Sequence, residues 1–189
     1  MSQVLQKSLA AKIKDDPKSV VFVVGAGVTM GALAGTKKPT SWSGLIKDGL
    51  DFAQERSHMT ADACDVCRQQ LGSPDSREWI SAAETLVANL GGNESGAYRT
   101  WLRQSVGTFA SEIRDRSVLD PLTKLAKLGV LLATTNYDSL LETSTGYAAV
   151  PWTKTSDVGR TIRGERGVVH FHGHWETSQS VVLGDSSYE

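Results

Sequence analysis

A glycine-rich turn directly after an apolar run is the first group of residues whose types could do chemistry. It reads Gly25-Ala26-Gly27-Val28-Thr29. Neither glycine has a Cβ, so backbone N–H groups here could approach a phosphate. The dinucleotide fingerprint G-x-G-x-x-G is incomplete, because the third glycine, Gly31, comes one position late. A turn that only makes room between a strand and a helix is the alternative interpretation.

A second polar cluster follows another apolar run and reads Thr134-Thr135-Asn136-Tyr137-Asp138. One side chain of this kind is enough to cap the helix that follows, and Asp138 could be that cap. Capping leaves Asn136 without a role. An amide and a carboxylate at the end of a strand could instead contact a ligand.

A third cluster holds three histidines, His170, His172 and His174. On a strand, His170 and His172 would share one face, where they could bind a metal with His174 as a third candidate ligand, or place a base. Gly173 interrupts the strand, so we expect His172 at the sheet edge where ligands arrive. We expect His170 to be a core histidine with satisfied hydrogen bonds. Trp175 could stack on a ligand, but packing is the more common use of a large aromatic side chain.

The only cysteines, Cys64 and Cys67, form a single C-x-x-C pair. A structural zinc site needs a second pair or two histidines about 12 to 20 residues downstream, and the sequence has neither. We therefore expect both cysteines to pack in the interior and predict that the protein needs no metal.

Three short apolar runs are predicted to be the strands that position these clusters. They span residues 19–24, 130–133 and 168–171, and the first is too apolar to alternate, which is typical of a strand covered on both faces. Each run ends in one of the polar clusters. In an open parallel sheet, ligands bind beyond the carboxyl ends of the strands, so the three clusters should converge.

The remaining segments are predicted to be mainly helical. Leu5, Leu9 and Ile13 lie on one face of an opening helix, and apolar spacing indicates several helices across residues 41–128. Gly129 is the expected C-cap of the last of these, and another helix begins near residues 139–142. Residues 153–167 are rich in Gly, Thr, Arg and Asp and are expected to form a loop. The predicted fold is α/β, a Rossmann-like open parallel sheet with a large helical insertion after the first strand.

Composition agrees with one domain and excludes some partners. The chain has 189 residues, of which 40% are hydrophobic, and its formal charge is −1. Such a balanced charge does not favour nucleic acid or an anionic bilayer. The longest apolar stretch falls far short of the roughly 20 residues of a membrane helix. The N-terminal residues lack the apolar stretch of an export signal, so a cytoplasmic location is expected.

Taken in chain order, the motifs resemble those of the sirtuin superfamily, and in particular its SIR2-like branch, which lacks the zinc ribbon and occurs in antiphage and related immune proteins. The motifs that carry the resemblance are Gly25-Ala-Gly-Val-Thr29, Pro39-Thr-Ser-Trp42, Thr134-Thr-Asn-Tyr-Asp138 and His172-Gly173. The resemblance implies an NAD+-binding domain that breaks the nicotinamide–ribose bond of NAD+ without a metal.

The resemblance also implies roles for particular residues. Gly25, Ala26, Gly27 and Thr29 would form the pyrophosphate loop. Asn136 and Asp138 would line the nicotinamide and its ribose. His172 would be the catalytic histidine, and Asn136 would be the second catalytic residue.

Two departures distinguish the chain from sirtuin deacylases. Thr135 stands where deacylases carry Gln in the cofactor site, and Pro39-Thr-Ser-Trp42 replaces their Pro-Asp-Phe-Arg loop. We therefore expect an NAD+ hydrolase that yields nicotinamide and ADP-ribose, with two alternatives: an NAD-dependent protein deacylase, and a non-catalytic module that senses NAD or ADP-ribose. NAD+ is the expected partner, and self-association into a homo-oligomer stays open.

The resemblance spans about Val20 to Tyr188. Because related proteins continue into strands that hold the adenosine end, residues 1–189 are expected to be the front part of a SIR2-like domain in a longer, defence-type protein. The helical insertion of that domain would span about residues 41–128.

Overall fold

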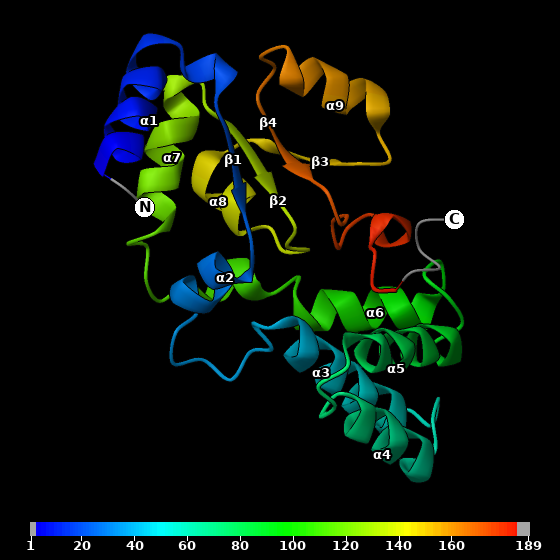
Figure 1. Ribbon diagram of the computed structural model, residues 1–189. Helices are drawn as coiled ribbons and strands as arrows, with labels where there is room; N and C mark the ends of the chain where they lie inside the picture. The colour runs from blue at the N-terminus through cyan, green and yellow to red at the C-terminus, as the bar shows by residue number, and fades with distance from the viewer. Residues whose placement is uncertain (1–2, 185–189) are drawn as a thin grey trace.

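The centre of the molecule is a four-stranded parallel sheet. A computed structural model of the chain describes residues 3–184 and shows the sheet in the order β1-β2-β4-β3, with helices around it (Figure 1). All three strand pairs are parallel, which confirms the predicted α/β class. The strands are β1 (Val21–Val24), β2 (Leu131–Thr134), β3 (Ala148–Pro151) and β4 (Gly167–His170).

The register of the sheet brings the carboxyl ends of all four strands into one row. Val24 pairs with Thr134, Thr134 pairs with His170, and Pro151 also pairs with His170. Each of these residues is the last of its strand. The polar clusters that follow β1, β2 and β4 therefore leave the sheet along the same edge.

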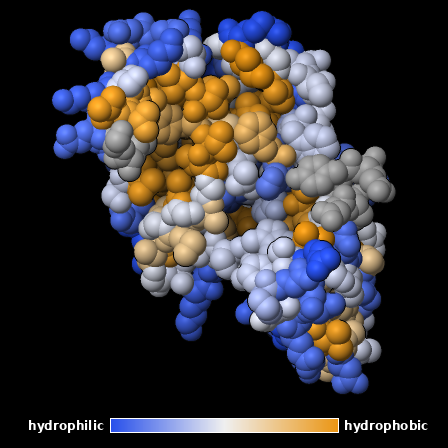
Figure 2. All heavy atoms as spheres, viewed as in Figure 1, coloured by the Kyte–Doolittle hydropathy of each residue, from blue (hydrophilic) through white to orange (hydrophobic). Residues whose placement is uncertain are grey.

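The expectation that the first strand is covered on both faces is wrong. β1 is an edge strand, and its burial alternates: Val21 and Val23 are 52% and 57% exposed, whereas Phe22 and Val24 are partly buried. Figure 2 shows hydrophobic residues gathered on the surface of the half of the molecule that holds the sheet. An apolar run shows that both faces are apolar, but the position of the strand in the sheet decides whether both are covered.

Helices pack around the sheet. The α7 and α8 helices contact each other and the strands β2 and β4, whereas α9 contacts β3 and β4. The opening helix is confirmed as α1, although none of its described residues is buried. The helix α7 ends at Gly129 with φ +106, which confirms the predicted C-cap. These helices are α1 (Gln3–Asp15), α2 (Ala26–Ala32), α7 (Leu119–Leu128), α8 (Leu140–Thr145) and α9 (Thr155–Ile162).

Four further helices form a separate layer beneath the carboxyl ends of the strands (Figure 1). The side chain of the residue before each helix accepts a hydrogen bond from a backbone N–H of its first turn, which satisfies a donor that the helix cannot. The capping residues are Ser41, Thr60, Asp75 and Ser95. The helices are α3 (Trp42–Glu55), α4 (Ala61–Gln70), α5 (Ser76–Asn89) and α6 (Gly96–Ser105), as the helical periodicity predicts.

The interior of this helical layer is built from large side chains. Trp101 and Tyr98 are fully buried and meet edge to face at 5.5 Å between ring centroids. Cys64 and Cys67 belong to the same core and are both free thiols. The expectation that these cysteines serve packing is confirmed.

The prediction of a loop over residues 153–167 is wrong. The segment contains α9, and the strand β3 just before it was missed altogether. In α9, Arg160 pairs with Asp157 and also with Glu165, which supports a helix that has few apolar residues. The sequence of β3 is Ala-Ala-Val-Pro, and its proline is tolerated because β3 is an edge strand that ends there.

None of the described helices is both long enough and apolar enough to cross a bilayer.

Candidate functional site

A cavity of about 240 Å³ lies where the carboxyl ends of the strands meet the helical layer. One wall comes from the segments after β1, β2 and β4, and the opposite wall comes from residues at the start of α3 and around the end of α6. The predicted convergence of the three polar clusters is confirmed. The lining residues are Ala26, Thr29, Pro39, Thr40, Ser41, Trp42, Leu45, Val106, Phe109, Thr135, Asn136, Tyr137, Asp138 and His172.

Asn136 is held in place from three directions. Its side-chain Nδ2 donates to the carbonyl of Gly25 at 3.1 Å and to Thr29 Oγ1 at 2.9 Å. Its backbone N–H donates to Thr134 Oγ1 at 2.9 Å. Its carbonyl lies 2.9 Å from His170 Nδ1. Both donors of the carboxamide are therefore used within the protein, and the acceptor Oδ1 is the atom left to meet a ligand.

Asp138 and Thr29 form a buried link between the segments after β2 and β1. Thr29 Oγ1 donates to Asp138 Oδ2 at 2.7 Å, and Asp138 Oδ1 accepts from the backbone N–H of Leu140 at 3.0 Å. Burial raises the pKa of Asp138, and these two hydrogen bonds oppose that rise. Asp138 therefore satisfies a backbone donor at the start of α8, as the capping interpretation predicts, and also reaches across to Thr29.

His172 lies in the turn after β4, half-buried, and lines the cavity together with Asn136. Burial lowers the pKa of its imidazole, so the ring is neutral near pH 7. No hydrogen bond joins its side chain to the residues that the structure describes, whereas its carbonyl accepts from Val182 N at 2.9 Å. The backbone is thus fixed while the ring nitrogens stay available.

Gly173 explains why the turn after His172 has its shape. Its φ is +87, in the region that glycine favours, and a Cβ at this position would lie 2.0 Å from the carbonyl oxygen of Ser180. Only glycine allows the chain to pass so close to the segment around Ser180. The shape of this turn therefore determines where His172 lines the cavity.

Packing does not require glycine at the two positions after β1, Gly25 and Gly27. Gly25 and Gly27 both have negative or extended φ, because neither is among the residues with positive φ. A Cβ on Gly27 would meet nothing within 4 Å, and one on Gly25 would only touch Thr135 Oγ1 at 3.5 Å. The space in front of Gly27 is therefore open.

His170 is fully buried, and both of its ring nitrogens have partners: the Asn136 carbonyl and, at 2.7 Å, Glu142 Oε1. The expectation of a satisfied core histidine is confirmed. The expectation that His170 and His172 share a strand face is wrong, because β4 ends at His170 and the turn carries His172 away. Glu142 was missed as a partner, although the predicted helix start at residues 139–142 includes it.

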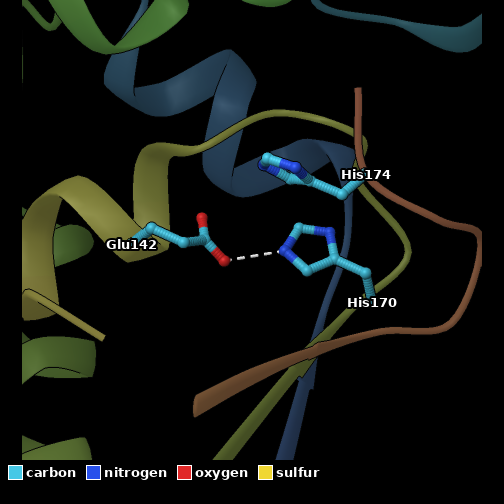
Figure 3. A group of neighbouring side chains, drawn as sticks. All are labelled: Glu142, His170 and His174. Atoms are coloured by element: carbon cyan, nitrogen blue, oxygen red, sulfur yellow. Dashed lines mark hydrogen bonds and ion pairs between the residues drawn. The ribbon is translucent and has the colours of Figure 1, made fainter. Parts of the chain in front are cut away.

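One group of side chains in the described part of the chain could hold a metal ion. Glu142, His170 and His174 each offer a ligand atom, and these atoms lie within 4.8 Å of one another (Figure 3). The group differs from the histidine set that the sequence suggests, since Glu142 takes the place of His172.

Trp175 is confirmed as a packing residue and donates through Nε1 to Ser139 Oγ at 2.8 Å.

A parallel α/β sheet with a cavity beyond the carboxyl ends of its strands is the arrangement of Rossmann-like ligand-binding proteins. Residues 130–189 match the SIR2-like domain family. The match begins one residue before β2 and includes both the cluster at residues 134–138 and His172. The recognition of a SIR2-like domain is therefore confirmed for this stretch. Members of the family are NAD-dependent enzymes, which indicates an NAD-related function.

Proposed function

We propose that the protein is an NAD+ hydrolase that releases nicotinamide and ADP-ribose. One observation supports this proposal most strongly: His172, a neutral histidine whose ring nitrogens have no hydrogen-bond partner among residues 3–184, lines the same cavity as the oriented carboxamide of Asn136. The cavity of about 240 Å³ is smaller than most ligand pockets and suits the nicotinamide riboside end of a dinucleotide.

The reaction needs a base and well-placed dipoles more than a strong nucleophile. When the bond between nicotinamide and C1′ of the ribose breaks, the bonding electrons leave with nicotinamide, which becomes neutral, and positive charge develops on the ribose. A water oxygen then bonds to C1′, and its proton passes to His172. Asn136 Oδ1 accepts a hydrogen bond from this water or from a ribose hydroxyl and so orients it.

The other predicted site residues take supporting roles in this proposal. The pyrophosphate lies against the backbone of Gly25, Ala26 and Gly27, where the open space in front of Gly27 leaves room for it. Thr29 acts through Asn136 and Asp138, because its hydroxyl already contacts both. Asp138 keeps a spare lone pair for the nicotinamide carboxamide, and Thr135 lines the cavity beside it.

The two alternative functions, a protein deacylase and a nucleotide sensor, would require different residues. A deacylase of the sirtuin type carries a zinc ribbon with paired C-x-x-C motifs, whereas the only such pair here, Cys64 and Cys67, is buried in the helical core. A sensor that only binds nucleotide has no chemical need for a histidine with free ring nitrogens at the cavity. Our proposal includes the zinc-free branch of the family that occurs in antiphage proteins, and with it a defence role.

The deciding experiment compares wild type with His172→Ala and a control, His58→Ala. His58 is exposed and stacks on Phe52 in the helical layer, outside the cavity. Each protein is incubated with NAD+, and nicotinamide and ADP-ribose are separated by chromatography. We expect His172→Ala to lose about 10²- to 10⁴-fold in rate and His58→Ala to match wild type. Turnover that requires an acylated peptide would indicate a deacylase, and NAD+ binding without products would indicate a sensor.

A further inference from the structure

A buried acid–histidine pair lies directly behind Asn136. Glu142 Oε1, from α8, is 2.7 Å from Nε2 of His170, at the end of β4 (Figure 3). The His170 side chain is 0% exposed and that of Glu142 is 12% exposed. Neither residue lines the cavity, so the pair lies outside the group of residues that would meet NAD+.

The contacts of His170 determine where its protons are. Nδ1 faces the carbonyl of Asn136, which can only accept, so Nδ1 carries a proton. Nε2 faces the Glu142 carboxylate, and a second proton is shared there. Burial alone would lower the pKa of His170, but the hydrogen bonds and charges of Glu142 and the other groups around the ring outweigh it and raise the pKa. With an acceptor facing each ring nitrogen, the geometry favours the imidazolium form, which donates on both sides.

This arrangement gives the Asn136 carbonyl a charged donor. Charge-assisted hydrogen bonds are shorter and about twice as strong as neutral ones. Together with the bond from Asn136 N–H to Thr134 Oγ1, this donor holds the peptide groups on both sides of Asn136. The Asn136 side chain leaves from this fixed backbone toward Gly25 and Thr29.

We propose that Glu142 and His170 act as positioning residues that set the orientation of the Asn136 carboxamide, a role that rests on the proposed NAD+ hydrolysis for its catalytic consequence. The pair works from the buried side of the loop and never touches the substrate. The neighbouring His174 serves as the internal comparison. Its ring lies 4.8 Å from that of His170, but its Nε2 bonds to Ser139 Oγ at 2.9 Å instead of to the Asn136 loop.

The test compares Glu142→Gln with a matched control, His174→Gln, in the full chain. Glu142→Gln keeps the size of the side chain and removes the charge that holds His170 as an imidazolium. We expect kcat to fall about tenfold while KM for NAD+ changes less than about twofold, because orientation of Asn136 matters most in the transition state. His174→Gln should lower the unfolding midpoint and leave kcat unchanged. A fall in stability without a change in kcat for Glu142→Gln would overturn the proposal.

Nuclear magnetic resonance gives a second readout that needs no activity. In the wild type at pH 7, both ¹⁵N nuclei of His170 should have the chemical shifts of a protonated ring. The side-chain amide signals of Asn136 should shift in Glu142→Gln and stay in place in His174→Gln. If wild type releases no nicotinamide but the His170 and Asn136 signals behave as expected, the hydrolase function is refuted and the positioning role stands. Unchanged Asn136 signals would refute the positioning role.

A zinc titration separates the pair from a metal site made of the same residues. Glu142 Oε2 is buried without a partner among the described residues, and an ion could use it. We expect no stoichiometric zinc binding, because a protonated His170 Nε2 has no lone pair to give to a metal and His174 Nε2 is bonded to Ser139 Oγ. Stoichiometric zinc binding by wild type that Glu142→Gln loses would make the group a metal centre and overturn the charged pair.

Discussion

Thr29 and Asp138 are 109 residues apart in the chain, and the Thr29 hydroxyl donates to Asp138 Oδ2 at 2.7 Å. The same hydroxyl accepts from Asn136 Nδ2 at 2.9 Å. One buried oxygen atom therefore joins the segment after β1 to both Asn136 and Asp138 after β2. This link orients Asn136 before any ligand arrives, which is how a preorganised site avoids rearrangement during a reaction.

Replacing Thr29 with valine should damage both stability and activity. Asp138 Oδ2 and Asn136 Nδ2 would each lose a partner in the interior, at a cost of about 1–3 kcal/mol in the free energy of unfolding. Urea denaturation measures this cost, and nicotinamide release measures the effect on turnover. Thr29→Ser keeps the hydroxyl and should recover most of both properties. If Thr29→Val unfolds at the wild-type urea concentration, the link does not stabilise the fold.

A methyl group on Gly27 should weaken NAD+ binding and spare the fold. The Cβ of Gly27→Ala meets nothing in the protein within 4 Å, and alanine favours the helix by up to about 1 kcal/mol. The methyl group would occupy the space proposed for the pyrophosphate, so KM for NAD+ should rise about tenfold, which corresponds to about 1.4 kcal/mol. Gly96→Ala, in the first turn of α6 with equally open surroundings, is the control. A normal KM in Gly27→Ala would place the pyrophosphate elsewhere.

The turn after His172 should not tolerate alanine at Gly173. Its φ of +87 and the 2.0 Å approach to Ser180 add steric overlap to backbone strain, so we expect a loss of more than about 3 kcal/mol in the free energy of unfolding. Gly146→Ala separates the two effects, because Gly146 has φ +75 but open space around it. That variant should lose only the strain, about 1–2 kcal/mol. Equal losses in both variants would show that overlap at Gly173 costs nothing.

The activity should fall at acidic pH, because protonation of His172 removes the proposed base. Burial lowers its pKa below the ordinary 6.5, so the base stays deprotonated at a lower pH than a free histidine would. A profile of kcat/KM against pH should therefore fall on the acid side with a midpoint below 6.5. A midpoint above 6.5 would contradict the assignment of His172 as the base.

The free energy of unfolding should also depend on pH through His172. Folding lowers the pKa of His172, so the native state binds fewer protons than the unfolded state, and the contribution of His172 to stability is complete above pH 6.5. That contribution is lost as pH falls through the folded pKa. The free energy of unfolding of wild type, measured by urea denaturation from pH 7 to pH 5, should therefore decrease more than that of His172→Gln. Parallel curves for the two proteins would show that His172 is not perturbed by folding.

The sequence alone determined which segments line the candidate site and that they meet. Apolar runs followed by polar clusters are local patterns, and parallel strands place their carboxyl ends along one edge, so the convergence of the segments around Gly25, Asn136 and His172 could be predicted. The burial of His170 was also expected, because it belongs to the apolar run at residues 168–171 and precedes the turn that carries His172. The helices of residues 41–128 followed from apolar spacing in the same way.

Only the tertiary structure decided which atoms pair and which faces are covered. The partners Thr29 and Asp138, and Glu142 and His170, come from different elements, and no local period indicates a contact between them. The edge position of β1 left Val21 and Val23 exposed although their residue types suit a covered strand. The strand β3 exists because β4 offers it a pairing edge. Periodicity reflects the geometry of a single element, whereas these features depend on packing between elements far apart in the chain.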